Sequence, residues 1–279
     1  MKDSEPTGID RLKRRAAKGK LLLGMVHLRP LPGSPRNSGE KVDAILEWAK
    51  RDAEAILEAG FDGWIVENFG DTPFFKDHVP PETIAAMTRI AAALPRRTAR
   101  GAVALAGVNV LRNDARAALG VTAAADLDLF RVNVHTGAMV ADQGLIEGKA
   151  AETLRARTAL GAHHAILADL LVKHAVPLGM GPVEPGALAL DLIERGGADG
   201  IIVSGPRTGA PADLVRLRAV KAAVPRTLLL VGSGATRESI QRILETADGV
   251  IVGSSLKKGS DTAQPIDRKL AQAFVRAAR

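Results

Sequence analysis

Short apolar runs alternate with longer segments of helical periodicity along nearly the whole chain. The runs are rich in β-branched residues, which is typical of strands that a parallel sheet buries on both faces. The predicted strands span residues 21–26, 62–68, 102–108, 127–134, 164–171, 199–203, 227–231 and 248–252. The predicted helices span residues 9–18, 41–59, 81–94, 113–125, 145–160, 184–195, 212–223, 237–245 and 265–278.

Eight such strand–helix units favour a single (β/α)8 TIM barrel, an α/β fold that typically takes about 250 residues. The 279 residues of the chain fit that size. A doubly wound sheet is the main alternative, but no Gly-rich dinucleotide-binding turn follows the first strand. We therefore predict a short helical extension at residues 1–19 and a barrel domain at residues 20–279.

One sequence unit recurs at every second predicted strand. Its variants are Asp62-Gly-Trp-Ile-Val-Glu-Asn, Asp128-Leu-Phe-Arg-Val-Asn-Val, Asp199-Gly-Ile-Ile-Val-Ser-Gly and Asp248-Gly-Val-Ile-Val-Gly-Ser. Alternate strands of a TIM barrel contribute the same layers of interior side chains. The repeat therefore predicts one layer at the strand ends, made of Glu67, Asn133, Ser204 and Gly253. It predicts a second layer beneath, made of Ile65, Arg131, Ile202 and Ile251.

The fourth predicted strand carries three polar residues on one face. The side chains of Arg131, Asn133 and His135 alternate with apolar ones and are expected to point the same way. Because burying an unpaired polar group costs several kcal/mol, roughly, these groups need protein partners, a ligand or both. A core network and a binding site are both consistent with this pattern. Arg131 also needs an acidic partner, for which Glu67 and Asp169 are the candidates.

Polar side chains gather at the C-terminal ends of the predicted strands, where TIM barrels place their active sites. The pattern indicates Glu67 or Asp169 as general base and His135 or Lys173 as general acid. Lys173 is also open to roles as Schiff-base nucleophile, substrate clamp or ion-pair partner of Asp169. The residues expected to contact substrate are His27, Asn68, Asp71, Asn109, Arg131, Asn133 and Ser204.

The last two predicted strands end in Gly-Ser turns. Gly232-Ser233-Gly234 follows the seventh strand, and Gly253-Ser254 follows the eighth. Small residues let backbone NH groups approach an anion, and Ser adds hydroxyl donors. TIM barrels commonly bind phosphate after strands seven and eight. We therefore predict a site for phosphate or another anion here; the alternative is that Gly serves only the tight turns.

No cofactor motif stands out in the sequence. The chain has no Cys, which excludes disulfides, iron–sulfur clusters, Cys-ligated zinc and thiol nucleophiles. Glu67, Asp169, His27 and His135 could hold a divalent metal ion, but they come from separate strands and lack the close spacing of a known ligand motif. No metal ligand is therefore assigned, and a divalent metal stays an alternative.

Composition and charge narrow the choice of partners and location. The net charge of +7 favours anionic partners. The basic residues are scattered and not interleaved with aromatic ones, so no nucleic-acid binding is expected. The N-terminus has no apolar signal segment, and no apolar run approaches the roughly 20 residues of a membrane helix. We predict a cytoplasmic protein, and analogy with other barrels suggests a homo-oligomer.

Several motifs resemble those of the BtpA family, which includes SgcQ-like proteins. They are Gly24-Met-Val-His-Leu-Arg-Pro-Leu-Pro-Gly-Ser-Pro35, Val66-Glu-Asn-Phe-Gly-Asp-Thr-Pro-Phe74, Gly107-Val-Asn-Val-Leu-Arg-Asn-Asp114, Phe130-Arg-Val-Asn-Val-His-Thr-Gly137 and Asp142-Gln-Gly-Leu-Ile-Glu-Gly-Lys-Ala150, with residues 169–175, 231–234 and 251–257. The likeness covers about residues 20–275, and Arg29 stands where Pro is expected.

The resemblance implies a TIM barrel but assigns neither a reaction nor a catalytic residue. The family is named for a membrane-peripheral factor needed to accumulate photosystem I in cyanobacteria. The first hypothesis is an enzyme, an isomerase, lyase or hydrolase, acting on a small phosphorylated metabolite such as a sugar or nucleoside phosphate. The second is a non-catalytic biogenesis or stability factor with peripheral membrane association. The third, a minor one, is a metal-dependent hydrolase.

Overall fold

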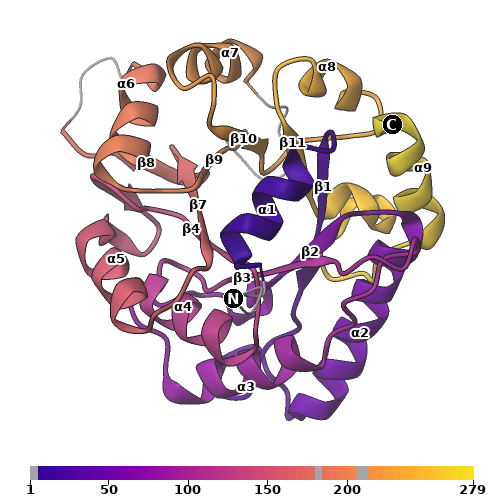
Figure 1. Ribbon diagram of the computed structural model, residues 1–279. Coiled ribbons are helices and arrows are strands. Elements are labelled where there is room, and N and C mark those ends of the chain that lie inside the picture. The colour runs from indigo at the N-terminus through magenta and orange to yellow at the C-terminus, as the bar shows by residue number, and fades with distance from the viewer. Residues whose placement is uncertain (1–5, 180–183, 206–212) are drawn as a thin grey trace, which may run out of the picture.

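Eight parallel strands close into a barrel, which confirms the predicted TIM-barrel fold (Figure 1). The computed structural model describes residues 6–179, 184–205 and 213–279. Around the barrel the strands follow the order β1-β11-β10-β9-β7-β4-β3-β2. They are β1 (Leu21–His27), β2 (Gly63–Glu67), β3 (Leu105–Asn109), β4 (Leu129–Val132), β7 (Ala165–Leu170), β9 (Gly200–Val203), β10 (Leu228–Val231) and β11 (Gly249–Val252).

Helices surround the barrel and cover its outer face (Figure 1). They are α2 (Val42–Ala59), α3 (Pro81–Ala93), α4 (Ala115–Ala124), α5 (Ala150–Ala159), α6 (Pro185–Leu190), α7 (Leu214–Ala223), α8 (Ile240–Leu244) and α9 (Arg268–Ala278). Outward strand residues such as Trp64 and Phe130 are fully buried beneath them. Burial of such large apolar side chains contributes about 1.5–3 kcal/mol each, so the sheet and its helical coat stabilise one another.

The interior of the barrel holds a second, separate apolar core. Ile65, Ile202 and Ile251 lie in it together, as the sequence repeat predicts. Arg131 occupies the equivalent place on β4 and is 4% exposed. The layer arrangement predicted from the repeat is therefore confirmed for these residues, and a single guanidinium replaces an apolar side chain at one position of a packed interior.

The Asp that begins each sequence repeat ties neighbouring strands together at the N-terminal end of the barrel. Asp62 Oδ2 accepts a hydrogen bond from Leu22 N at 2.8 Å, and Asp248 Oδ2 accepts one from Leu229 N at 2.9 Å. Asp128 and Asp199 do the same for the amides of β3 and β7. The sequence pattern alone assigned these acids no role. The repeated residues therefore form a contact that joins neighbouring strands, and they also form the interior layers.

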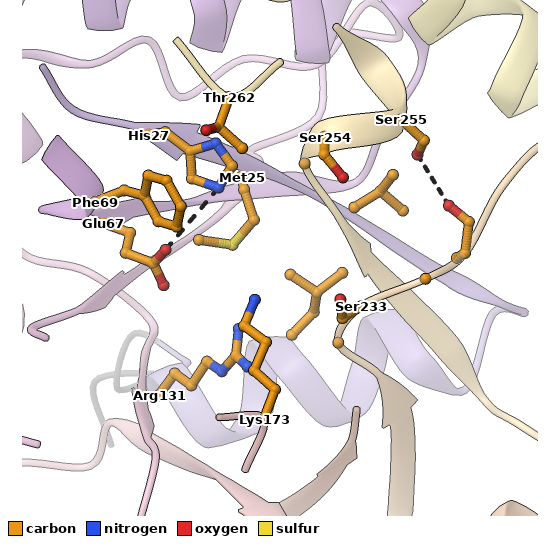
Figure 2. Close-up of a pocket in the computed structure, with 16 residues that line it drawn as sticks. Met25, His27, Glu67, Phe69, Arg131, Lys173, Ser233, Ser254, Ser255 and Thr262 are labelled. Atoms are coloured by element: carbon orange, nitrogen blue, oxygen red, sulfur yellow. Dashed lines mark hydrogen bonds and ion pairs between the residues drawn. The ribbon is translucent and has the colours of Figure 1, made fainter. Parts of the chain in front are cut away.

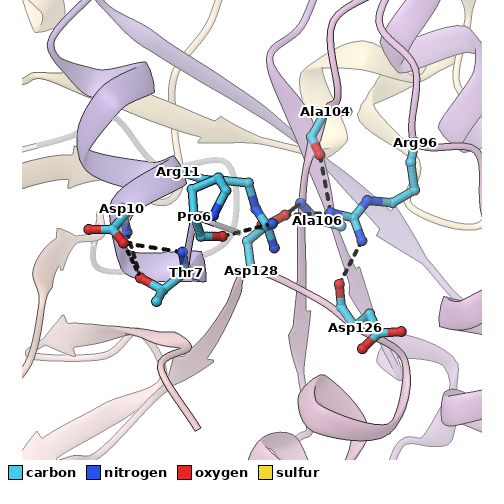
Figure 3. A network of polar contacts seen from close by, with 9 residues as sticks. All are labelled: Pro6, Thr7, Asp10, Arg11, Arg96, Ala104, Ala106, Asp126 and Asp128. Atoms are coloured by element: carbon cyan, nitrogen blue, oxygen red, sulfur yellow. Dashed lines mark hydrogen bonds and ion pairs between the residues drawn. The ribbon is translucent and has the colours of Figure 1, made fainter. Parts of the chain in front are cut away.

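Helix α1 (Gly8–Ala16) lies across the N-terminal opening of the barrel (Figure 1). Its Leu12 is buried in the interior core. Its Arg11 forms an ion pair with the fully buried Asp128, and Arg96 Nη2 lies 2.7 Å from the other oxygen of that carboxylate (Figure 3). Since Asp128 also accepts from Ala106 N at 2.8 Å, one carboxylate connects α1, β3 and β4.

Replacing Asp128 by Asn is expected to lower the free energy of unfolding by about 3 kcal/mol, because it leaves two guanidinium groups without their buried counter-charge. Urea unfolding of the two proteins measures the difference. The matched control is Asp126→Asn, since Asp126 is exposed and its φ of 52° suits Asn. Equal stability of the two variants would contradict the structural role of Asp128.

A small three-stranded sheet was not predicted. Strands β5 (Ala138–Ala141), β6 (Gly144–Glu147) and β8 (Ala175–Pro177) form an antiparallel sheet in the order β6-β5-β8. The predicted helix at residues 145–160 is therefore wrong at its start, because α5 begins at Ala150. Gly144 adopts φ 91°, a left-handed conformation that favours a hairpin turn over a helix.

The third barrel strand also begins later than predicted. The prediction started it at residue 102, whereas β3 begins at Leu105. Arg97 and Val103 form an isolated antiparallel bridge, and Gly101 between them has φ 76°. Residues 98–102 therefore form a tight loop that returns the chain to the barrel, and a run of small apolar residues was mistaken for the start of the strand.

Candidate active site

A pocket opens at the C-terminal mouth of the barrel (Figure 2). It is lined by Met25, His27, Glu67, Phe69, Arg131, Lys173, Gly232, Ser233, Gly234, Ala235, Ile251, Val252, Gly253, Ser254, Ser255 and Thr262. These residues include members of the predicted catalytic, substrate-binding and phosphate-binding sets. The Gly-Ser turns follow β10 and β11, and Glu67 ends β2, which only β1 separates from β11, so neighbouring strands bring the turns and this carboxylate into one pocket.

Arg131 pairs with Asp169, which resolves the choice that the sequence left open. Arg131 Nε and Nη2 lie 2.9 and 2.8 Å from the two oxygens of Asp169. Burial disfavours the charged guanidinium, but the adjacent Asp169 outweighs burial and raises the pKa of Arg131. Asn133 Nδ2 donates to the same carboxylate at 2.6 Å, and Ser204 Oγ lies 3.5 Å from it. Asp169 is therefore occupied as an acceptor. Together with Asn133 it lines a separate cavity, whereas its partner Arg131 lines this pocket.

Glu67 keeps one carboxylate oxygen available to the pocket. Its Oε2 accepts a hydrogen bond from Asn109 Nδ2 at 2.6 Å. Its Oε1 accepts no hydrogen bond within the described part of the chain, and the nearest basic atom is His27 Nε2 at 3.9 Å. Asn109 thus holds the carboxylate in place from behind. Of the two acids predicted as general base, only Glu67 can accept a proton without first breaking an ion pair.

His27 closes the side of the pocket next to Glu67. Burial, together with Lys257, Lys173 and Arg131, places the pKa of His27 well below its ordinary value. The imidazole is therefore neutral near pH 7, and its 3.9 Å contact with Glu67 is not an ion pair. Phe69 packs against it with ring centroids 4.8 Å apart. His27 is thus positioned as a neutral hydrogen-bonding group.

Lys173 enters the pocket from the loop after β7. Its carbonyl oxygen accepts a hydrogen bond from Arg112 Nη2 at 2.7 Å, which anchors that loop to the loop after β3. Burial lowers the pKa of Lys173, and the guanidinium groups of Arg131 and Arg112 oppose its charge, although Glu67 and Asp169 favour it. Figure 2 shows the side chains of Lys173 and Arg131 close together, opposite His27.

The two Gly-Ser turns present backbone donors to the pocket. Within the described residues, the NH groups of Ser233, Gly234 and Ala235 donate to no protein acceptor. Gly234 has φ 77°, a conformation that few other residues adopt. Ser255 Oγ donates to Ala235 O at 2.9 Å and links the turns that follow β10 and β11. Consecutive free NH groups of this kind form a concave site that suits an anion.

Some predicted substrate contacts lie behind the pocket. Asn68 Oδ1 accepts from Leu111 N at 2.8 Å, and its amide nitrogen lies 3.2 Å from Asp71 Oδ2. Asp71 Oδ1 in turn accepts from Leu31 N at 2.8 Å, and burial raises its pKa. Asn68 and Asp71 therefore connect the loops after β1, β2 and β3. Their buried network shapes the pocket indirectly.

His135 does not reach the pocket, in contrast to its predicted place at the mouth. Its Nε2 lies 2.7 Å from Gly196 O, and the side chain is 1% exposed. The reason is that β4 ends at Val132, so the two-residue alternation stops before His135. The side chain instead lines a separate cavity between the small sheet and α6. A role as general acid in the barrel pocket does not fit this location.

The proposed metal ligands do not converge. Asp169 pairs with Arg131, His135 contacts Gly196, and only His27 and Glu67 lie near each other. Within residues 6–179, 184–205 and 213–279, no group of three or more His, Cys, Asp or Glu side chains could hold a metal ion. The described side chains therefore supply no metal site of their own.

Phe69 and Thr262 line the pocket but were not predicted, and neither was the supporting role of Lys257. Phe69 and Thr262 line the pocket from loops. Lys257 is buried outside the pocket, where its Nζ lies 3.6 Å from Asp52 and donates to Thr262 O at 3.0 Å. Sequence offered no signal for this pair, because Asp52 belongs to α2 and lies about 200 positions earlier. The pair fastens the loop after β11 to the helical coat.

Acidification is expected to destabilise the protein through its buried histidines. Burial lowers the pKa of both His27 and His135. As the pH falls below about 6.5, the unfolded chain takes up protons before the folded one, so stability is complete above that pH and is lost below it. Between about pH 7.5 and 5.5, each residue is expected to cost about 1 kcal/mol.

Urea unfolding at the two pH values tests this expectation for wild type and for His27→Asn and His135→Asn. Each variant should show a smaller loss on acidification than wild type does. The control for the substitution itself is His78→Asn, at an exposed position. A loss that is the same in all four proteins would assign the pH dependence to other groups.

Comparison with known sequences gives one consistent family. The sequence profile of the BtpA family matches residues 18–279. The photosystem I biogenesis protein BtpA of Synechocystis is 46% identical over 92% of this chain and 87% of its own length. An uncharacterized protein of Pyrococcus furiosus is 42% identical over 92% of this chain and 94% of its own. A mitochondrial protein of Caenorhabditis elegans, also uncharacterized, is 34% identical over 88% of both chains.

Comparison with solved structures gives the same barrel. A structure described as native KDPGal aligns with a TM-score of 0.54 and 17% identity, covering 92% of this chain and 93% of the other. Phosphoribosyl anthranilate isomerase of Thermus thermophilus aligns with a TM-score of 0.51 and 14% identity, covering 92% and 97%. At these identities the likeness establishes the fold and leaves the reaction open.

Proposed function

Since the chain belongs to the BtpA family and carries a polar pocket at the mouth of a TIM barrel, we propose that it is an enzyme acting on a small phosphorylated metabolite. One observation about the pocket carries this proposal. The free oxygen of Glu67 and the side chain of Lys173 share one pocket with the unpaired NH groups of the Gly-Ser turns. An acid–base pair and an anion site therefore lie within reach of one small molecule.

The phosphate would sit against residues 232–235 and 253–255. The NH groups of residues 233–235 have no acceptor in the described part of the protein, and Ser233 and Ser254 add hydroxyl groups. Packing of the barrel interior requires Gly at position 232, because a Cβ there would lie 2.3 Å from Ile202 Cγ2 and 3.3 Å from Arg131 Nη2. A TIM barrel commonly binds phosphate after its last two strands, which here are β10 and β11.

The reacting part of the substrate would lie between Glu67 and Lys173. Glu67 Oε1 is the general base in this proposal, and Asn109 orients it through the opposite oxygen. Lys173 provides a polar group on the other side of the pocket, and the neutral His27 can donate or accept a hydrogen bond. Proton removal next to a carbonyl group is the step that this arrangement suits best, and isomerases and lyases both use it.

A thermal-shift screen tests the proposal. Inorganic phosphate, sugar phosphates and nucleoside monophosphates are added separately to wild type and to Glu67→Gln. Phosphate-bearing compounds should raise the melting temperature of both proteins, because a ligand that binds the folded state stabilises it. Unphosphorylated sugars and nucleosides should have little effect. Equal shifts with both kinds of compound would argue against the anion site.

Replacing Ser233 by Asp is expected to abolish the stabilisation by phosphate. The new carboxylate would lie among the turn NH groups and repel an anion. Ser233 lines the pocket and is only half-buried, so the folded state should tolerate the change. The control is Ser260→Asp on the exposed loop after β11. If phosphate raises the melting temperature of the Ser233→Asp protein as it does for the control, the anion lies elsewhere.

A second candidate, a non-catalytic biogenesis or stability factor, is favoured by the 46% identity to the Synechocystis photosystem I biogenesis protein. A basic hollow at the N-terminal end of the barrel would be its docking surface, with Arg14, Lys18, Arg100 and Arg279 in its lining. No described helix is both long enough and apolar enough to cross a membrane. Peripheral membrane association and homo-oligomer formation stay predictions.

Complementation of a deletion strain separates the two candidates. An enzyme requires Glu67 and tolerates changes in the basic hollow. A docking factor shows the reverse, with Glu67→Gln active and the combined Arg14→Gln, Lys18→Gln and Arg100→Gln protein inactive. Relatives of comparable length occur in archaea and in a nematode, so a role confined to photosystems does not account for the whole family.

A further inference from the structure

Lys173 is held in the pocket by an unusual turn. Leu171 and His174, on either side of it, have φ values of 55° and 60°. The left-handed region is sparsely populated by residues other than Gly, and such strain, of order 1–3 kcal/mol for each residue, is concentrated at functional sites. Arg112 holds the turn through the carbonyl oxygen of Lys173. The side chain of Lys173 is thereby directed into the pocket and not along the surface.

Among the residues that the structure describes, no carboxylate pairs with the amine of Lys173. Within the described residues its Nζ forms neither an ion pair within 4.0 Å nor a hydrogen bond, and Asp169 is already occupied by Arg131. The two internal segments outside the described residues, 180–183 and 206–212, contain no Asp or Glu. Glu67 lies across the pocket and is held by Asn109. Burial and the two neighbouring guanidinium groups oppose the charge of this amine and lower its pKa, although Glu67 and Asp169 favour the charge.

We propose that Lys173 is a nucleophile that forms a Schiff base with the carbonyl group of a phosphorylated aldehyde or ketone. The alternative, a clamp for the phosphate, works best with a fully charged ammonium group, whereas burial opposes the charge of this amine. The phosphate already has donors in the Gly-Ser turns. This inference rests on the proposed function and adds to it the class of substrate and the covalent step.

The atoms and electrons of the proposed imine formation balance with the side chains in the pocket and with solvent. The lone pair of Lys173 Nζ attacks the carbonyl carbon, and the carbonyl electron pair moves to its oxygen. One proton passes from the nitrogen to that oxygen through Glu67, a second comes from solvent, and water leaves to give a protonated imine. Glu67 then removes a proton from the adjacent carbon, and the C–H electron pair forms the carbon–carbon double bond of an enamine while the imine electrons return to nitrogen.

Borohydride trapping tests the proposal. The full-length protein is incubated with dihydroxyacetone phosphate, glyceraldehyde 3-phosphate or ribose 5-phosphate and then reduced with sodium borohydride. Intact mass should rise by one reduced adduct per chain with at least one of these compounds. Peptide mapping should place the adduct on Lys173. Lys221, which pairs with Asp248 at 2.7 Å, serves as the internal control lysine and should stay unmodified.

Lys173→Arg is the decisive variant, because it keeps a positive charge but cannot form an imine. It should lose the adduct and still be stabilised by phosphate. No adduct at Lys173 with any probe, or an adduct shared equally with Lys221, overturns the Schiff base. If phosphate still raises the melting temperature in that case, the proposed function stands. If unphosphorylated dihydroxyacetone labels Lys173 as fast as its phosphate does, the Schiff base stands and the phosphate site fails.

Discussion

Changing Glu67 to Gln is expected to slow proton exchange on a bound substrate by about 10²–10⁴-fold, the usual contribution of a positioned general base. Gln keeps the size of the side chain and can still accept the hydrogen bond from Asn109 Nδ2. It cannot take up a proton at the position of Oε1. The expected loss is therefore one of catalysis, with binding of phosphate compounds retained.

The measurement does not require the complete reaction. Wild type is incubated in deuterated water with the carbonyl phosphate that shifts its melting temperature most, and NMR follows deuterium entering the carbon next to the carbonyl. Glu47→Gln is the matched control, because the Glu47 side chain is 66% exposed on α2. Exchange that is as fast in Glu67→Gln as in Glu47→Gln would remove Glu67 from the role of base.

Replacing Asp169 by Asn is expected to lower the free energy of unfolding by about 3–5 kcal/mol, because it leaves the buried charge of Arg131 without compensation. Both side chains of this pair are almost fully buried, and two of the Arg131 nitrogens lie within 2.9 Å of Asp169 oxygens. Asn can accept one of these hydrogen bonds but carries no charge. Urea unfolding measures the loss.

Two further variants separate the charge effect from a general weakening of the barrel. Asp191→Asn removes one partner of an exposed pair, with Arg195 Nε 3.7 Å away, and should change stability by less than about 0.5 kcal/mol. Arg131→Met combined with Asp169→Leu removes both buried charges and should be more stable than Asp169→Asn. If the double variant is the less stable one, the stability of the barrel depends on the ion pair between Arg131 and Asp169 itself.

The repeat in the sequence was enough to predict which residues share a layer of the barrel. Ile65, Ile202 and Ile251 lie together in the interior core, and Arg131 takes the fourth place. This succeeded because side chains on a strand alternate strictly and alternate strands contribute the same layers. The alternation is local, so a single strand is sufficient to read it. It also predicted correctly that Arg131 needs a buried acid.

The alternation along one strand does not predict which residue of another strand pairs with a buried side chain. Glu67 and Asp169 both lie at the ends of strands, and nothing in their local sequence shows which of them meets Arg131. The choice follows from barrel order, because β4 pairs with β7, and Arg131 lies opposite Leu167 in the register. Asp169, two residues further along β7, then lies within reach. Glu67, on β2, is separated from β4 by β3.

Beyond the end of a strand, the alternation of polar and apolar residues no longer predicts which way a side chain points. His135 continues the alternation of Arg131 and Asn133 in the sequence, but β4 ends at Val132, and the chain turns towards Gly196. The small sheet of β5, β6 and β8 was missed for a related reason. Its strands have three or four residues each, and β8 comes more than 25 residues after β6. Such short strands are stable only because they pair with one another and pack over Met139, Ile146 and Val172.

The sequence by itself determined the barrel, its interior layers and the end of the barrel at which polar groups gather, because these follow from the spacing of residues along single strands and helices. The tertiary structure decided which acid neutralises Arg131, which acid is left free in the pocket, and that Lys173 pairs with none of the described carboxylates there. These facts depend on contacts between strands far apart in the chain. The energy of a buried charge depends on what surrounds it in space, and only the closed barrel specifies those surroundings.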